Sequence, residues 1–303
     1  MRIAPEVAAA LRGGTPVVAL ESSVFAQGLP APANREAADR MMRAVRASGA
    51  VPAVMAVARG VASAGLEPDE LARFLLGEGV RKVSARDVPL AMAQGADGAT
   101  TVAAAMMLAH GAGIAVLATG GIGGVHRAPA YDESADLLEL ARTPVLVVCS
   151  GAKAILDLPA TAERLETLGV PVIGYRTDAM PAFWARTSGF PLAARAESAA
   201  EVAAAWRMHR ALGRPQGMVV MQPVDASVAV SAAAVRRAVR AADRRASIKK
   251  VRGAARTPWM LAAVDAATKG KARAANLALL EANAALAAAI ARALVPREGA
   301  RSG

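Results

Sequence analysis

The chain alternates short apolar runs with longer segments in which apolar residues recur at helical spacing. A short apolar run bounded by turn residues is typical of a buried strand, and a longer amphipathic segment is typical of a helix. We expect strands at residues 17–20, 54–58, 114–118, 145–149, 172–175 and 218–221. We expect helices at residues 34–48, 68–76, 102–110, 135–142, 161–168, 201–212, 232–246, 259–267 and 274–294. This order predicts an α/β fold with a mostly parallel central sheet that carries helices on both faces.

The chain has 303 residues, of which 54% are apolar, and this is enough for one large hydrophobic core. Neither an internal repeat nor a linker-like segment divides it. We therefore predict a single catalytic domain over residues 1–295. Residues 296–303 are terminal and are expected to form a disordered tail.

The formal net charge of +11 suits nucleic acid, a membrane surface or an anionic substrate. Much of the excess lies in residues 236–256, which hold nine basic residues and one acid, Asp243. No aromatic residues interleave there for base stacking, so we do not expect nucleic-acid binding. We interpret the stretch as the solvated face of a helix and its exit loop. A channel rim that attracts a phosphorylated ligand is the alternative.

The cysteine count and the apolar segments indicate the cellular compartment of the protein. The single Cys149 excludes an intramolecular disulfide, which is typical of a reducing compartment. The first residues contain no apolar signal core, and no stretch is a convincing membrane span. We expect a cytoplasmic protein without a membrane partner.

Lysine usage is the most unusual feature of the composition. Up to residue 248 the chain has 24 arginines and only two lysines, Lys82 and Lys153. Arginine stays protonated, whereas a desolvated lysine can lose its proton and act as a base or form a Schiff base. Lys153 follows the most apolar expected strand, with Gly151 just before it. It is therefore our candidate for Schiff-base chemistry.

Polar residues also follow other apolar runs, where open α/β sheets bind ligands. Glu21 ends the first run, and burial there would raise its pKa and prepare it as a general acid. A helix cap or a surface turn is the alternative for Glu21. Lys82, Ser84 and Arg86 lie within five residues and suit an anion such as phosphate, unless they form a surface charge cluster.

Four glycines occur within five positions at residues 120–124, followed by His126 and Arg127. Such a loop lets the backbone approach a ligand closely, and its N–H groups can bind an anion. The spacing is not that of a dinucleotide-binding fingerprint. The adjoining His126 and Arg127 strengthen the prediction of a binding site.

Acidic residues follow this loop. A hard divalent cation such as Mg²⁺ or Mn²⁺ can take one carboxylate from Asp132, Glu133 or Asp136 and keep several waters. The alternative is that these acids and Ser134 only cap the helix expected from residue 135.

Eight motifs occur in one order along the chain. They are ALESS, KVSARD, GATTVAAAMMLA, ATGGIGGVHR, ESADLLEL, RTPVLVVCSGAK, LETLGVPVIGY and PAFWARTSG. Together they closely resemble the pseudouridine-5′-phosphate glycosidase family over residues 3–294. Each motif alone is weak, but the ordered set is highly specific.

The resemblance implies an activity and an assembly. The family reversibly cleaves the C–C glycosidic bond of pseudouridine 5′-phosphate, a phosphorylated nucleoside, to uracil and ribose 5-phosphate. It uses a divalent metal, usually Mn²⁺, and forms homotrimers on an α/β fold. These properties are expectations for this chain.

The resemblance also implies site residues. The nucleophilic lysine falls on Lys153, the acid on Glu21 and the metal-binding aspartate on Asp132. We expect substrate contacts at Lys82, Val102, Ser134, Ala135, Asp136, His126, Arg127 and Asn283.

The chain departs from the family pattern at several positions. Gln27 stands where the family usually has histidine, and Val54, Ala85 and Gln222 also differ. Lys153 and Glu21 are intact, so the chemistry is expected to stay. The departures motivate an alternative, a related C-glycosidase or C-glycoside synthase acting on another C-linked ribosyl phosphate.

Overall fold

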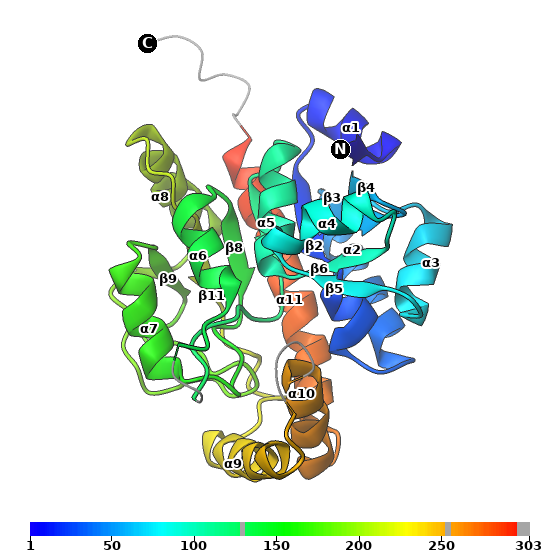
Figure 1. The fold of residues 1–303 in the computed structure, drawn as a ribbon. Helices are drawn as coiled ribbons and strands as arrows, with labels where there is room; N and C mark the ends of the chain where they lie inside the picture. The colour runs from blue at the N-terminus through cyan, green and yellow to red at the C-terminus, as the bar shows by residue number, and fades with distance from the viewer. Residues whose placement is uncertain (128–130, 252–255, 296–303) are drawn as a thin grey trace.

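The computed structural model describes residues 1–127, 131–251 and 256–295, which form a mixed sheet with helices packed around it (Figure 1). The strands follow the order β1-β4-β3-β2-β7-β8-β11-β9-β10, and β5 and β6 lie off this path. From β3 to β10 along this order, neighbours pair in parallel. The strands are β1 Arg2–Ile3, β2 Val17–Glu21, β3 Val51–Ala58, β4 Val61–Ala64, β5 Arg81–Val83, β6 Gly98–Thr100, β7 Val116–Ala118, β8 Leu146–Cys149, β9 Val172–Tyr175, β10 Arg195–Ala196 and β11 Met218–Met221.

Helices cover both faces of the sheet, which confirms the predicted fold class. In Figure 1, α5 and α6 lie in front of the sheet and α11 lies behind it, where it contacts α2, α8 and β7. The α-helices are α1 Pro5–Arg12, α2 Ala33–Ala47, α3 Pro68–Leu76, α4 Val88–Ala93, α5 Val102–Gly111, α6 Ala135–Arg142, α7 Leu158–Thr167, α8 Ala199–Ala211, α9 Ala232–Ile248, α10 Arg256–Ala267 and α11 Lys271–Leu294. Two short helical turns, η1 Val24–Gly28 and η2 Ala85–Asp87, complete the described elements.

All six predicted strands are present, but the structure has five further short strands that the sequence did not predict. β1, β4, β5, β6 and β10 have two to four residues each and no apolar run of their own. β4 and β6 pair with β3 in antiparallel fashion, which makes the sheet mixed. Lys82 lies within β5, one of these short strands, and not after a strand as predicted. The predicted tail at residues 296–303 lies outside the described residues.

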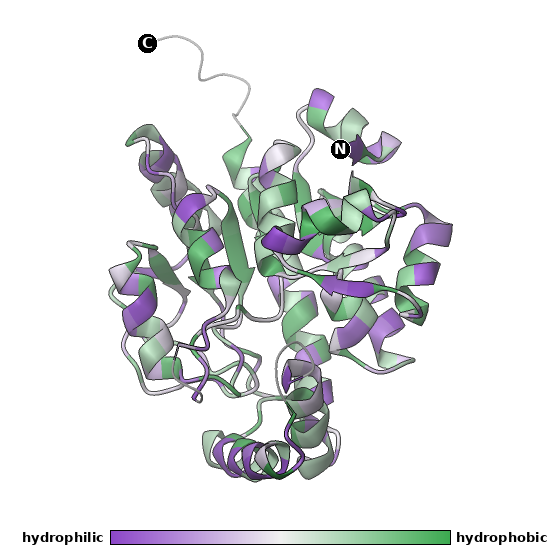
Figure 2. Ribbon diagram, in the orientation of Figure 1, coloured by the Kyte–Doolittle hydropathy of each residue, from purple (hydrophilic) through white to green (hydrophobic). Residues whose placement is uncertain are grey.

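Helix α11 is long and apolar enough to pass as a membrane span by length and composition alone. Its most apolar window is 56% buried within the protein. Figure 2 shows this helix as a mainly hydrophobic element behind the sheet. Because it packs against α2, α8 and three strands, we interpret it as a core helix.

The basic stretch lies mainly on α9, which packs against α10 below the sheet in Figure 1. The buried face of α9 holds alanine and valine, whereas Arg236, Arg240 and Arg244 are exposed. These residues match the solvated-face interpretation. Arg256 differs, because it donates to Asp243 at 2.6 Å and is only 14% exposed.

Asn283 of α11 holds the carboxyl ends of β7 and β8 together. Its side chain is fully buried. Its Nδ2 donates to the carbonyl oxygen of Thr119 at 2.9 Å and to Ser150 Oγ at 3.1 Å. A buried polar group satisfied in this way is costly to disrupt.

We predict that Asn283→Ala lowers the free energy of unfolding by about 2 kcal/mol or more, because it leaves two buried partners unsatisfied and creates a cavity. Urea denaturation measures this. The control is Glu281→Ala on the same helix, whose side chain is 49% exposed, and which should change stability by less than about 0.5 kcal/mol. Equal losses in the two variants would contradict the role assigned to Asn283.

Candidate active site

Three adjoining cavities lie beside the carboxyl ends of β2, β7 and β8. The first, here the anion cavity, has a volume of about 320 Å³ and is lined by Lys82, Val102 and Asp136 among others. The second, here the throat, leaves about 50 Å³ and runs past Thr119 and Gly120. The third, here the outer cavity, has about 410 Å³. The throat adjoins each of the other two through shared lining residues.

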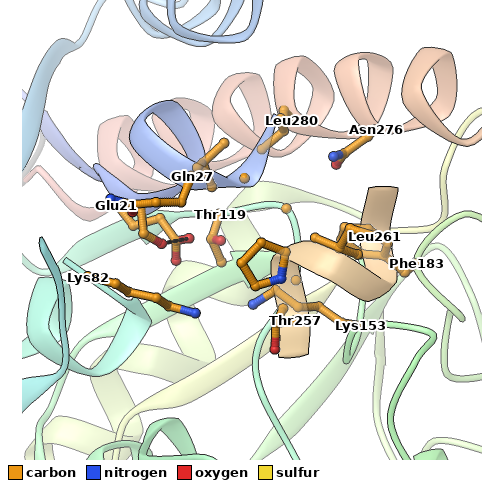
Figure 3. A pocket seen from close by; sticks show the side chains of 16 residues that line it. Glu21, Gln27, Lys82, Thr119, Lys153, Phe183, Thr257, Leu261, Asn276 and Leu280 are labelled. Carbon is orange, nitrogen blue, oxygen red and sulfur yellow. Dashed lines mark hydrogen bonds between the residues drawn. The ribbon is translucent and has the colours of Figure 1, made fainter. Parts of the chain in front are cut away.

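Glu21, Lys82 and Lys153 line both the throat and the anion cavity, so they mark the junction between them. Figure 3 shows the three side chains directed toward the same space, with Thr257 of α10 beside Lys153. They come from β2, β5 and the segment after β8. The structure therefore brings together the two predicted catalytic residues and the predicted phosphate-binding lysine.

Glu21 has the properties of a general acid. Its side chain is 3% exposed, and its Oε1 accepts a hydrogen bond from Ser23 Oγ at 3.0 Å. Burial raises the pKa of Glu21 above its usual range, although the positive charge of Lys153 and the Ser23 hydrogen bond oppose this shift. A protonated carboxyl is thus favoured next to the junction, and the surface-turn alternative is excluded.

The protonation of Lys82 depends on its surroundings at the junction. Burial lowers the pKa of Lys82 below its usual range, and the charge of Lys153 lowers it further. Glu21 and Asp136 oppose this shift. The main chain of Lys153 is held by a hydrogen bond from its N–H to the carbonyl oxygen of Ile122 at 3.1 Å.

The glycines of residues 120–124 serve close packing against the protein itself. A Cβ at Gly123 would lie 2.1 Å from Ser134 Oγ, and one at Gly124 would lie 2.4 Å from Thr161 Oγ1. Larger residues are excluded at these two positions because neighbouring side chains occupy the space. The loop was expected to approach a ligand, and Gly120 and Gly121 line the throat while Gly123 lines the anion cavity.

Asp136 joins this loop to helix α5. Its carboxylate is 4% exposed and accepts hydrogen bonds from the N–H of Ala103 at 2.9 Å and the N–H of Gly123 at 2.8 Å. Ile122, next to Gly123, accepts from the N–H of Lys153. The carboxylate of Asp136 therefore sets the position of the loop and, through it, of the lysine backbone.

Two helix N-termini border the anion cavity. Val102 is the first residue of α5 and Ala135 the first of α6, and both line the cavity. The first N–H groups of a helix have no partner within the helix and favour negative charge. This explains how two apolar residues can be substrate contacts, namely through their main-chain N–H groups. Ser134 caps α6 by accepting from the N–H of Asp136 at 3.2 Å.

His126 lines the anion cavity, and its main-chain N–H donates to the carbonyl oxygen of Asp132 at 2.8 Å. Burial lowers the pKa of His126, whereas the Asp132 carboxylate raises it. Arg127 lies elsewhere. It donates to the carbonyl oxygen of Leu156 at 3.3 Å and lines a separate cavity of about 300 Å³. Asn283 also lies outside the lining of the three cavities, where it supports Thr119 from behind.

The described residues contain no group of three or more His, Cys, Asp or Glu side chains arranged around one metal ion. Glu133 is engaged with Arg164 at 2.9 Å. Asp132 and His126 remain as a neighbouring carboxylate and imidazole. This donor set fits a hard divalent cation that keeps most of its water.

Unsatisfied polar atoms concentrate at the three cavities. Eight buried side-chain polar atoms lack a hydrogen-bond partner within the described parts of the chain. Five of them belong to residues that line the cavities, namely Glu21 Oε2, Gln27 Oε1, Ser84 Oγ, Thr119 Oγ1 and Trp184 Nε1. Because native proteins satisfy most buried polar groups, such a concentration is typical of a ligand site.

Sequence reasoning missed the wall opposite Glu21. Thr257 and Leu261 of α10 and Asn276 of α11 line the throat. They lie about 100 or more residues after Lys153 and carry no motif that we interpreted. Phe183 also lines the throat, and the motif PAFWARTSG contained its only signal. Cys149 is buried in the hydrophobic core, and this burial raises the pKa of its thiol to about 12.

The fold and the site define an α/β enzyme in which an amine and a buried carboxyl group lie at the edge of a polar cavity. Comparison with known proteins agrees. Residues 6–293 match the family model of indigoidine synthase A like protein. The chain is 58% identical to pseudouridine-5′-phosphate glycosidase of Gemmatimonas aurantiaca over 94% of each chain. It is 50% identical to the protein of that name from Herpetosiphon aurantiacus, covering 96% of this chain and 97% of the relative.

Solved structures share the fold. A crystal structure of the prealnumycin C-glycosynthase AlnA in complex with ribulose 5-phosphate has a TM-score of 0.89 and 39% identity, covering 97% of this chain and 96% of that one. An indigoidine synthase A-like protein from Thermotoga maritima has a TM-score of 0.86 and 36% identity over 92% of each chain. The chain belongs to the pseudouridine-5′-phosphate glycosidase family, whose members are the indigoidine synthase A-like proteins.

We predict that Asp136→Asn lowers the free energy of unfolding by about 2 kcal/mol, because an amide can accept from only one of the two N–H groups and turns its own donor toward the other. Chemical denaturation measures the loss. Asp69→Asn is the matched control, since Asp69 also lies in the first turn of a helix but is exposed. A loss of similar size at Asp69 would show that the effect belongs to helix ends in general.

Proposed function

We propose that the enzyme reversibly cleaves the C–C glycosidic bond of pseudouridine 5′-phosphate, giving uracil and ribose 5-phosphate through a Schiff base on Lys153. The observation that carries the proposal is the junction of Lys153 with Glu21 beside the anion cavity. The names of the similar curated proteins support the same substrate.

The bond that breaks explains why a lysine is needed. A C–C glycoside has no heteroatom leaving group, so the usual pair of carboxylates is not sufficient. In our proposal the neutral Lys153 amine attacks C1′ while Glu21 protonates the ring oxygen, and the C1′–O4′ bond breaks. The Glu21 carboxylate, which has given its proton to O4′, takes a proton from the newly bonded nitrogen. The nitrogen lone pair then forms the protonated imine as the C1′–C5 bond breaks. Uracil leaves as a stabilised carbanion and takes up a proton at C5, and water hydrolyses the imine.

The phosphate group is assigned to the anion cavity. Lys82 supplies a positive charge, and the main-chain N–H groups of Val102 and Ala135, the first residues of α5 and α6, supply donors. Binding of the phosphate, remote from the reacting carbon, positions the sugar between Glu21 and Lys153.

A divalent cation, Mn²⁺ or a similar ion, is assigned to Asp132 with His126 beside it. Such a cation supplies positive charge that stabilises negative oxygen atoms of the substrate. In this assignment the carboxylate of Asp132 would hold the ion, and the imidazole of His126 would lie beside it. The proposal also includes a homotrimer in the cytoplasm, in keeping with the family resemblance.

A second candidate is a related C-glycosidase or C-glycoside synthase that uses another C-linked ribosyl phosphate. The similarity to the prealnumycin C-glycosynthase favours it, as does the 410 Å³ outer cavity, which exceeds the size of a pyrimidine. A substrate panel separates the two. Uracil release from pseudouridine 5′-phosphate no faster than background would favour the second candidate.

The imine is tested by borohydride trapping. With ribose 5-phosphate and Mn²⁺, the wild type should gain one reduced sugar-phosphate adduct in its intact mass, because hydride fixes the Schiff base. Lys153→Ala should gain none, whereas Lys82→Met should still form the adduct at higher ribose 5-phosphate. An adduct that persists in Lys153→Ala and disappears in Lys82→Met would assign the nucleophile to Lys82 instead.

The pH dependence of cleavage tests the acid. Burial raises the pKa of Glu21, and the Ser23 hydroxyl lowers it by donating to the carboxylate. The rate should fall as pH rises through the pKa of Glu21, because the acid form is lost. Ser23→Ala removes the opposing hydrogen bond, so the falling limb of kcat should move to higher pH. A limb that stays in place or moves to lower pH would contradict this assignment.

A further inference from the structure

The boundary between the throat and the anion cavity includes a residue that the proposed reaction does not use. Five residues line both cavities, namely Glu21, Ser23, Lys82, Lys153 and Thr257. The proposed reaction uses Glu21 with its neighbour Ser23, and it uses the two lysines. Thr257, which α10 contributes from the far end of the chain, has no role in it.

The position of Thr257 on α10 directs its side chain into the site. Thr257 and Leu261 are four residues apart, so they lie on the same face of the helix, and both line the throat. Met260 and Val264 occupy the neighbouring face and are buried in the core. Figure 3 shows Thr257 beside Lys153. A sugar held at the boundary between the two cavities therefore passes next to the Thr257 side chain.

The hydroxyl of Thr257 is available to a ligand. Thr161 and Thr167 of α7 each donate their hydroxyl to the carbonyl oxygen four residues earlier, as is usual in a helix. The Thr257 hydroxyl makes no such bond to any described residue, and it is not among the fully buried atoms that lack a partner. The residue is half-buried, so its oxygen keeps contact with the cavity. A hydroxyl can both donate and accept, which suits another hydroxyl.

We propose that Thr257 hydrogen-bonds the hydroxyl group on C2′ of the sugar and makes the enzyme specific for ribosyl over 2-deoxyribosyl phosphates. The inference rests on the proposed function, in which Lys153 attacks C1′. Because C2′ is bonded to C1′, its hydroxyl is the sugar hydroxyl nearest to the nucleophile and to Thr257 beside it. The C3′ hydroxyl lies one carbon further toward the phosphate.

The small size of the throat makes this contact selective. Its free volume of about 50 Å³ leaves little room for water between Thr257 and a bound sugar. A 2-deoxyribosyl ligand would cover the hydroxyl without bonding it, and a site that bonds a ligand hydroxyl discriminates against an analogue that lacks it. Arg256 donates to Asp243 of α9 at 2.6 Å, which holds the start of α10 in place. Bonds to the 2-hydroxyl strengthen in glycosidase transition states, so the contact should affect rate as well as binding.

The first test compares two sugars in three proteins. Ribose 5-phosphate and 2-deoxyribose 5-phosphate are each trapped with borohydride on the wild type, Thr257→Val and Thr257→Ser, and intact mass gives the second-order rate constant of adduct formation. Thr257→Val keeps the shape and removes the hydroxyl. It should lower the rate constant with ribose 5-phosphate about 10-fold and change that with 2-deoxyribose 5-phosphate by less than about twofold. Thr257→Ser keeps the hydroxyl and should stay within about threefold of the wild type on ribose 5-phosphate.

The design separates the contact from general effects. Each sugar is compared with itself across the proteins, so a difference between the sugars in free aldehyde content cancels. Thr167→Val is the matched control, because Thr167 is exposed on α7 and lines none of the three cavities, and it should leave both rate constants unchanged. An equal loss on the two sugars in Thr257→Val, or no loss on either, would overturn the inference.

The second test, calorimetric titration, does not depend on the imine. The wild type should bind ribose 5-phosphate about 10-fold more tightly than 2-deoxyribose 5-phosphate, and Thr257→Val should bind the two alike. A wild type that does not distinguish the sugars overturns the inference, even where the variant does not fold. A wild type that distinguishes them through Thr257 but forms no adduct contradicts the Schiff base on Lys153 and supports the contact at Thr257.

Discussion

The carboxylate of Asp136 is the contact on which the site depends. It is buried and accepts from one N–H at the start of α5 and one in the glycine loop. The loop in turn accepts from the N–H of Lys153. Removing the charge would release the helix end, the loop and the lysine backbone together. The glycines at 123 and 124 are required because Ser134 and Thr161 approach within contact distance of them. The carboxylate of Asp136 and the glycine loop thus both position the main chain of Lys153 and pack the loop against its neighbours.

The site works by separating polar environments along one path. The anion cavity gathers Lys82 and two helix N-termini, which favour negative charge. The junction holds Glu21, whose pKa is raised by burial. The throat beyond is narrow and bounded by apolar residues of α10. Low solvent access strengthens each electrostatic interaction inside, and it also makes every unsatisfied buried polar atom costly.

Much of the fold could be predicted, because its central strands are continuous apolar runs separated by segments with helical periodicity. The short strands β1, β4, β5, β6 and β10 could not, since they have no apolar run of their own and are defined by their pairing with other strands. Glu21 and Lys153 were predicted because they lie at or shortly after the ends of apolar runs, and the structure places Glu21 at the end of β2 and Lys153 in the segment after β8. Thr257 and Asn276 were not, because tertiary packing brings them to the throat from the end of the chain. Arg127 and Asn283 show the opposite limit. Both were expected to contact the substrate, but the structure shows their side chains hydrogen-bonded to the protein.

The scarcity of lysine in the sequence can be interpreted from the positions of the two lysines in the fold. The first 248 residues contain two lysines, and both line the same junction although 70 positions separate them. Several arginines of the same region form surface ion pairs, such as Arg46 with Glu6, in which a permanent charge suffices. An amine that must lose its proton cannot be replaced by guanidinium. The charge of Lys153 lowers the pKa of Lys82, so the junction favours the neutral form of Lys82. The two lysines of the first 248 residues thus meet at one buried junction, whereas the arginines that form ion pairs lie mostly at the surface.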